Sequence, residues 1–411
     1  MNEIVRDTED YKITKREIYL DQAASSDPEP EVMVDVMTDI NHNFYNPSSI
    51  YAPARTVALY MDIARIKVKK FINARDEDQI IFGSCASEMI ALALGNSHVI
   101  TSYIEHPTLR HRMINEQIIR VDEYGYIDLE SLEQSLIWAK KKLGCRPIVA
   151  FADVNSEIGV IQDIESITEL AHKYNALVCV DHSQGAAHYP IDVQIYDIDM
   201  LVMTSEKCGC IRGTGVLYVR KGLNIDPLWS GGNQESGLRP GTENTYCINA
   251  FVNQLERISS DFEERMAREY IINSFMIETI LESCEGLCNV TFYPYFGRTK
   301  NKIDKIEEDS FFINHVPNII SAKFDGIDNQ ELLTLLDIAH VCCSAGSACS
   351  SYEKESSHVL KAIGLTDEEA NNVLRFSFDY RLKDEEIIEF GRRLRKCLNI
   401  ITDNWDYEGK D

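Results

Sequence analysis

The chain has 411 residues, and its 66 Asp and Glu against 41 Lys and Arg give a formal net charge of −25 at pH 7. At roughly 150 residues per domain this length predicts two or three structural units, and a hydrophobic content of 44% excludes disorder over the whole chain. The acidity argues against a protein that binds nucleic acid or an anionic membrane, because phosphates would repel it.

Apolar strand-like runs alternate with helix-period segments in the first half of the chain. Amphipathic helices are predicted at 28–42 and 53–72. The alternation that follows is typical of a mostly parallel sheet covered by helices on both faces. In such sheets ligands bind beyond the carboxyl ends of the strands. The strand candidates are 79–82, 98–101, 147–154, 176–181, 200–204 and 215–219, with helical stretches such as 128–143 and 163–174 between them.

One long helical pattern, 244–285, leads to a smaller second part of the chain. We therefore expect a large domain over 18–250 and a smaller α+β domain over 251–411, on which residues 1–17 could pack. The polar segment 295–314 is interpreted as a surface excursion. The smaller domain's strand candidates are 288–293, 318–324 and 373–378, and its helices lie near 328–339 and 383–400.

The N-terminus is charged and lacks the apolar core of a signal sequence, and no run reaches the roughly 18 apolar residues of a membrane span. These features predict a cytoplasmic protein without membrane contact. The twelve cysteines of such a chain are expected to be free thiols or buried apolar residues. Cys208-Gly-Cys210 and Cys342-Cys343 lack the paired CxxC spacing of a zinc site, so no metal centre is predicted.

Polar residues follow several predicted strands at their carboxyl ends. Lys207 comes after 200–204 and Asp181 ends 176–181. Alone, the lysine reads as a solvated loop residue and the aspartate as a helix cap. Together they are what pyridoxal phosphate requires, because a lysine forms the Schiff base and an aspartate pairs with the protonated pyridine nitrogen. His106 follows another strand, where it could stack on a ring or move a proton, and Asn155 ends a fourth.

Two Gly- and Ser-containing turns could serve a phosphate group. GSCASE, at 83–88, joins a strand to a helix and would expose backbone N–H groups at the helix N-terminus. This motif is common and therefore weak by itself. The loop 230–244 is rich in glycine and contains Thr242; it reads equally well as a flexible surface loop.

From about Ile18 to Cys397 the chain resembles the cysteine desulfurases, within the class V group of pyridoxal-phosphate aminotransferases. Single markers are weak, but their ordered set is specific. The resemblance implies a fold type I α/β enzyme that works as a homodimer. The markers are YLDQAASS, NPSS at 46–49, VNSEIGVIQDI, VDHSQG, the Lys207 segment, SGGNQESGLRPGTEN, SAGSACSS at 344–351 and LRFSF at 374–378.

The resemblance also implies roles in cofactor binding. Lys207 would be the Schiff-base lysine, Asp181 the partner of the pyridine nitrogen and Gln184 a contact of the ring hydroxyl. His106 would stack over the ring and help in proton transfer, and Asn155 would orient ring or substrate. The residues that would hold the phosphate are Ala86, Ser87 and Thr204, with Thr242 reaching in from the partner subunit.

For the substrate, the resemblance implies that Arg375 binds a carboxylate through a bidentate pair and that Cys349 attacks the sulfur and keeps it as a persulfide. The reaction would convert L-cysteine to L-alanine and pass sulfur to an acceptor protein, for example in iron–sulfur cluster assembly. A selenocysteine lyase would use the same residues. Another class V aminotransferase would not need Cys349, and a non-enzymatic scaffold is the alternative of a different class.

Three positions depart from the family pattern. The family usually has His before the Schiff-base lysine and a small residue one position earlier, where this chain has Glu206 and Ser205. A small residue usually follows the pyridine-pairing aspartate, where this chain has His182. A carboxylate beside a phosphate is repulsive. We therefore expect Glu206 to turn away or to be neutralised by Arg212 or His182, with a hydroxyl of Ser205 or Thr204 as the replacement donor.

Overall fold

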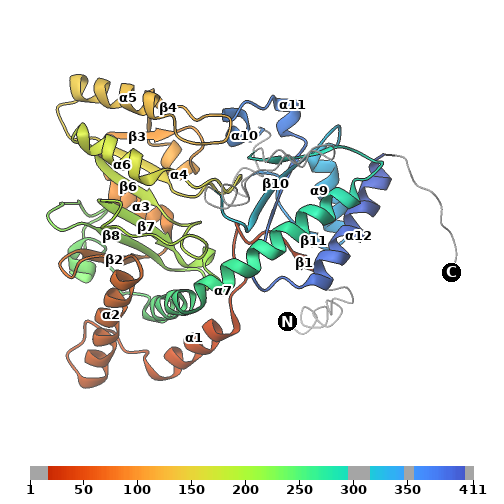
Figure 1. Ribbon diagram of the computed structural model, residues 1–411. Helices are drawn as coiled ribbons and strands as arrows, with labels where there is room; N and C mark the ends of the chain where they lie inside the picture. Colours follow the sequence, from red (N-terminus) through yellow and green to blue (C-terminus); the bar gives the residue numbers. More distant parts are fainter. Residues whose placement is uncertain (1–16, 295–314, 347–355, 403–411) are drawn as a thin grey trace, which may run out of the picture.

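The computed structural model describes residues 17–294, 315–346 and 356–402. Figure 1 shows two parts, joined by the long helix α7 (Thr245–Ser283). The larger part holds a seven-stranded sheet in the order β2-β8-β7-β6-β5-β3-β4. Its strands are β2 (Gln79–Gly83), β3 (Val99–Ser102), β4 (Met113–Ile119), β5 (Ile148–Ala152), β6 (Leu177–Asp181), β7 (Met200–Thr204) and β8 (Gly215–Val219).

Strands β4, β3, β5, β6 and β7 run parallel, and β8 is antiparallel to both of its neighbours, β7 and β2. The predicted α/β class with a mostly parallel sheet is therefore confirmed. Parallel strands end at one edge of the sheet, so the segments after β3, β5, β6 and β7 meet there. The helices of this part are α1 (Pro30–His42), α2 (Ala52–Phe71), α3 (Ala86–Leu94), α4 (Pro107–Arg110), α5 (Leu129–Lys142) and α6 (Ile164–Lys173).

Alternating side chains of the buried strands build two cores, one on each face of the sheet. In β5, Val149 and Phe151 pack with residues of α2, α5, α6 and α7, whereas Ile148 and Ala150 pack with residues of α3. Because both faces are covered, the strands are continuous apolar runs rather than alternating ones. This packing on both faces fixes where each strand ends and therefore where the residues that follow it lie.

The smaller part contains the antiparallel sheet β12-β10-β9 and a parallel pair of β1 with β11. Its core includes Ile18 and Leu20, although the sequence-based division assigned residues from 18 onward to the larger domain. The elements are β1 (Ile18–Tyr19), β9 (Val290–Tyr293), β10 (Ile319–Phe324), α9 (Asn329–Ile338), β11 (Val341–Cys342), α10 (His358–Ala362), α11 (Asp367–Ala370), β12 (Val373–Ser377) and α12 (Asp384–Ile401).

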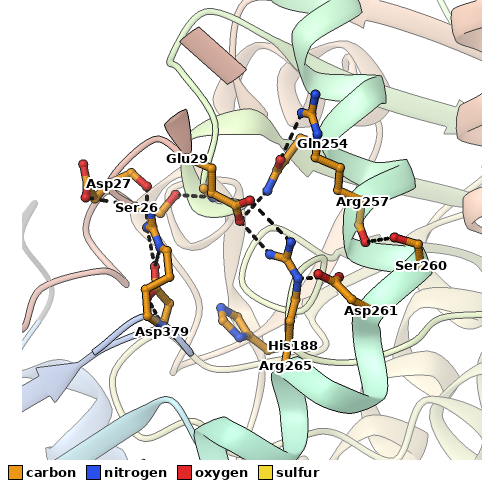
Figure 2. A network of polar contacts seen from close by, with 12 residues as sticks. Ser26, Asp27, Glu29, His188, Gln254, Arg257, Ser260, Asp261, Arg265 and Asp379 are labelled. Carbon is orange, nitrogen blue, oxygen red and sulfur yellow. Dashed lines mark hydrogen bonds and ion pairs between the residues drawn. The ribbon is translucent and has the colours of Figure 1, made fainter. Parts of the chain in front are cut away.

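Helix α7 contributes to both main cores and bends between them. Its backbone leaves helical geometry at Asp261, where φ is −128° and ψ is 23°. Across this kink, Nε of Arg265 donates to Oδ1 of Asp261 at 2.5 Å, and Nη1 donates to Oε1 of Glu29 at 2.6 Å. Figure 2 shows Arg265 between these two carboxylates, with Gln254 also directed at Glu29. The buried charge network thus joins both halves of α7 to the segment that precedes α1.

The helices and strands expected from the sequence lie within two residues of the observed ones. Strand β4 was not predicted, nor were the two-residue strands β1 and β11. The segment 295–314 lies outside the described residues. Among the described helices, none combines the length and apolar character that a membrane crossing needs.

Candidate active site

A cavity of about 250 Å³ opens at the carboxyl edge of the large sheet. Nine of the eleven site residues predicted from the sequence line it. One of these nine, Arg375, comes from β12 of the smaller sheet. The structure therefore brings together side chains from the segments after β3, β5, β6 and β7. The nine are Ala86, Ser87, His106, Asn155, Asp181, Gln184, Thr204, Lys207 and Arg375.

Lys207 lies in the 3₁₀ turn Ser205–Lys207, directly after β7. Its Nζ donates to the backbone carbonyls of Ala23 and Ala24, the latter at 2.6 Å. The turn is held by Ser26, whose hydroxyl donates to the carbonyl of Glu206 at 2.8 Å. Glu29, three residues after Ser26, belongs to the charge network at the α7 kink. The segment that holds this turn is therefore itself tied to α7.

Asp181 ends β6 and points its carboxylate into the cavity wall, where it is 8% exposed. Its Oδ1 accepts hydrogen bonds from the hydroxyl of Ser183 at 2.5 Å and from the backbone N–H of the same residue at 3.1 Å. Burial raises the pKa of Asp181, and the hydrogen bonds from Ser183 oppose that rise. A cation placed against this carboxylate would stabilise its charged form.

The imidazole of His106 is held by the turn that follows it. The backbone N–H of Thr108 donates to Nδ1 at 3.2 Å, which leaves the ring proton of a neutral imidazole on Nε2. Burial lowers the pKa of His106, and the nearby Lys207 adds to this effect while Asp181 opposes it. A neutral imidazole in this place can accept or pass on a proton.

Glu105 is a buried carboxyl that the sequence analysis did not single out. Its two oxygens accept hydrogen bonds from the Ser102 hydroxyl at 2.6 Å and the Ala152 N–H at 2.8 Å. Burial raises the pKa of Glu105 to about 8, and the charges of Asp181 and Asp153 add to the rise. The only signal in the sequence was its position next to His106.

Two amide side chains in the cavity wall are fixed by backbone contacts. Asn155 donates to the carbonyl of Ile104 at 3.0 Å and accepts the N–H groups of Glu157 and Ile158. Gln184 donates to the carbonyl of Ala23 at 2.8 Å. Both therefore present a defined orientation to anything bound in the cavity.

The N-terminus of helix α3 faces the cavity through Ala86 and Ser87. No side chain caps this helix at Cys85, so its first N–H groups are suited to an anion. The hydroxyl of Ser87 lies 3.0 Å from that of Thr108. Thr204, which also lines the cavity, is buried at the end of β7.

Glu206 lines the same cavity, and its Oε2 accepts the Thr204 hydroxyl at 2.9 Å. The expected partners are engaged elsewhere: Arg212 donates to Ser25, and His182 is paired with Asp153. Of the two hydroxyls expected to replace the missing donor, that of Thr204 is directed at Glu206 itself, and that of Ser205 donates to the carbonyl of Ile211. The carboxylate is thus part of the cavity wall.

Arg375 is 2% exposed and is held in place by two acceptors. Nη1 donates to the carbonyl of Ser156 at 2.8 Å, and Nη2 donates to Oδ1 of Asp21 at 2.8 Å. Its buried Nε has no hydrogen-bonding partner among the described residues. Since a buried donor without an acceptor is costly, this N–H is suited to an incoming carboxylate. Asp21 belongs to the motif YLDQAASS, but its role in holding Arg375 was not predicted from the sequence.

Thr242, one of the remaining two predicted residues, is not among the residues that line the cavity. Thr242 is exposed in the loop before α7. Cys349 lies outside the described residues. Within the described ranges, no group of three or more His, Cys, Asp and Glu side chains is placed to hold a metal ion.

The chain is similar to known proteins in both sequence and fold. Residues 18–292 match the family described as aminotransferase class-V. A protein named cysteine desulfurase IscS from Clostridium botulinum is 30% identical over 394 residues, which cover 90% of this chain and 92% of that protein.

Two solved structures are also similar. The structure titled NifS-like protein from Rickettsia africae shares the fold, with a TM-score of 0.80 at 24% identity over 93% of this chain and 100% of that one. The structure titled SspA in complex with cysteine has a TM-score of 0.70 at 25% identity, covering 88% of this chain and 98% of that one. With the family match over most of its length, the chain belongs to the class V aminotransferase family.

Proposed function

We propose that this protein is a pyridoxal-phosphate-dependent cysteine desulfurase. The observation that carries the proposal is the meeting of Lys207, Asp181 and Arg375 in one cavity. An amine, a buried carboxylate and a guanidinium are the groups needed to hold an aldehyde cofactor with a basic ring nitrogen and a substrate carboxylate. The similarity to proteins named cysteine desulfurase supports the same choice.

The cavity fits pyridoxal phosphate in the chemistry of its donors. Asp181 would hold the ring nitrogen, Lys207 would bind the aldehyde carbon, and His106 would lie against the ring. When bound, the cofactor supplies an electron sink for charge that develops at the substrate Cα. The residues suited to the phosphate are Ala86 and Ser87 at the α3 N-terminus and Thr204. Thr242 would be contributed by a partner subunit.

Substrate recognition would rest on Arg375, whose unpartnered Nε can donate to the carboxylate of L-cysteine. Lys207 and neutral His106 would hold and move protons at Cα. The thiolate of Cys349 would attack the substrate sulfur, so that an S–S bond forms as the Cβ–S bond breaks. The electron pair left on Cβ takes up a proton, giving L-alanine and a persulfide on Cys349 for transfer to an acceptor protein.

A homodimer is part of the proposal. Helices α1 and α2 and the loop between them expose large apolar side chains, which a second copy could cover. Thr242 is exposed and would act in the partner's site. Sedimentation should show a dimer, and a fully active monomer would contradict this assembly. The exposed apolar residues include Met33, Val34, Met37, Phe44, Ile50, Leu59 and Ile66.

Replacing Lys207 tests the function. The wild-type protein with pyridoxal phosphate should show a visible absorption band and form alanine from L-cysteine. Lys207→Ala should lose both, whereas Lys173→Ala, an exposed lysine on α6, should keep both. Alanine formation that survives in Lys207→Ala would show that the assignment is wrong.

A further inference from the structure

His182 and Asp153 form a pair whose chain neighbours, among them Val154 and Asp181, line the candidate site. Strands β5 and β6 run parallel with Ala152 opposite Asp181, so the next residues of each strand also lie side by side. Because side chains alternate along a strand, His182 points away from the direction of Asp181. Nδ1 of His182 and Oδ2 of Asp153 are 2.5 Å apart.

The pair is completely enclosed, since both side chains are 0% exposed. Within the described part of the chain, Nε2 of His182 and Oδ1 of Asp153 have no hydrogen-bonding partner. The pair fits only because residue 185 has no side chain. A Cβ on Gly185 would lie 2.4 Å from Nδ1 of His182 and 2.9 Å from Oδ2 of Asp153. Glycine at 185 is therefore a condition for this contact.

Three carboxyl groups meet in this layer. Asp153, Asp181 and Glu105 act on one another, and the charge of Asp153 raises the pKa values of the other two. Burial raises the pKa of Glu105 to about 8, which favours its uncharged form at neutral pH. His106 and Lys207 face Asp181 from the cavity side. On the other side, His182 contacts Asp153, and Tyr189 also lies near enough to interact with the charge of Asp153.

An isolated buried carboxylate is costly, and a like charge nearby disfavours ionisation of its neighbour. A positive charge on His182, which contacts Oδ2 of Asp153, would compensate the charge of Asp153. Without it, the repulsion between Asp153 and Asp181 would favour a protonated Asp181, which cannot pair with a cation.

We propose that His182 and Asp153 form a charge-compensated pair that keeps the neighbouring Asp181 ionised and in position for a cationic ring nitrogen. This role rests on the proposed function, because it concerns the residue that would hold pyridoxal phosphate. His182 is thus a positioning residue that acts through Asp181. This role explains why the chain has the large, titratable His182 at a position where the family usually has a small residue.

The test measures dissociation constants for pyridoxal phosphate in the full-length protein, by fluorescence titration. His182→Gln keeps a donor for Asp153 but removes the positive charge. It should raise the dissociation constant on the order of tenfold, the size that coupling between contacting residues reaches. Asp153→Asn removes the charge that needs compensation and should change the constant by less than about threefold. The double variant Asp153→Asn/His182→Gln should match Asp153→Asn.

This rescue separates charge compensation from packing, since a purely structural His182 would give additive losses. If His182→Gln does not fold, the double variant and Asp153→Asn still have to bind alike. His172→Gln is the matched control, because His172 pairs with Asp199 at 2.8 Å at the amino edge of the same sheet. Its thermal stability should fall while its cofactor affinity stays unchanged.

Two results would overturn the inference alone: wild-type affinity in His182→Gln, or a double variant bound more than about tenfold more weakly than Asp153→Asn. A wild-type protein that binds no pyridoxal phosphate would overturn the proposed function together with this role of the pair. The wild-type titration therefore distinguishes the two failures.

Discussion

Asp21 and Arg375 are 354 positions apart in the chain, yet Oδ1 of Asp21 lies 2.8 Å from Nη2 of Arg375. The same oxygen accepts the hydroxyl of Ser344 at 2.9 Å. The N-terminal strand segment thereby fixes the guanidinium at the border of the two sheets. With Asp21 on one side and the Ser156 carbonyl on the other, Nε has no partner among the described residues and is a donor available to a ligand.

Asp21→Ala should destabilise the fold by about 3 kcal/mol, because it leaves the buried Arg375 cation without its partner. Urea unfolding measures the loss. The control is Asp27→Ala, since Asp27 is exposed and 3.8 Å from Arg381; its effect should stay below about 1 kcal/mol. Equal effects of the two substitutions would show that the Asp21–Arg375 pair contributes no more than a surface contact.

Glu105 should make stability depend on pH. Its folded pKa, about 8, lies above the ordinary value of 4.5, so the folded state binds the proton more tightly than the unfolded state. Its contribution to stability is fully present below pH 4.5 and is lost as the pH rises through 8. Glu105→Gln mimics the protonated carboxyl. Relative to this variant, the wild type should lose up to about 1.4 kcal/mol per pH unit across this window.

Unfolding of both proteins by urea at pH 5, 6, 7 and 8 measures this difference. A constant difference between the wild type and Glu105→Gln would mean that Glu105 is ionised in the folded protein at all four values.

Glu206→Gln should tighten binding of pyridoxal phosphate. The Gln side chain keeps an acceptor for the Thr204 hydroxyl but removes a negative charge from the cavity wall. Two unit charges roughly 4 Å apart repel by about 4 kcal/mol at an effective dielectric of about 20. A gain of about tenfold in affinity would correspond to a third of that energy. Fluorescence titration against the control Glu133→Gln, a partly exposed carboxylate on α5, checks it. Unchanged affinity would place the phosphate away from Glu206.

Cys349→Ser should separate sulfur transfer from substrate binding. L-Cysteine should still bind, because Lys207, Asp181 and Arg375 are intact, but sulfide release should collapse, since a hydroxyl is a poor acceptor for sulfur. Mass spectrometry of the wild type after L-cysteine should find a persulfide on Cys349. A persulfide on Cys342 or Cys343 would assign the role to another thiol.

Local pattern in the sequence was sufficient for the α/β class, for most helices and strands and for four residues of the cavity wall. The resemblance to the class V family implied the other five, which are Ala86, Ser87, Gln184, Thr204 and Arg375. Lys207, Asp181, Asn155 and His106 each follow a strand, and parallel strands end at a common edge, so their meeting could be predicted without coordinates. Strand β4 was missed because its sequence, MINEQII, mixes polar and apolar residues without the apolar continuity of the other strands.

Only the tertiary structure decided which side chains contact one another. Asp153 meets His182 because β5 and β6 are neighbours in a register that sets Ala152 opposite Asp181. Asp21 meets Arg375 because the chain returns to its first strand after more than 350 residues. Sequence periodicity reports which face of an element is buried, but the order and register of strands depend on packing between distant segments. The partners of Glu206 and Arg375 therefore could not be read from the sequence.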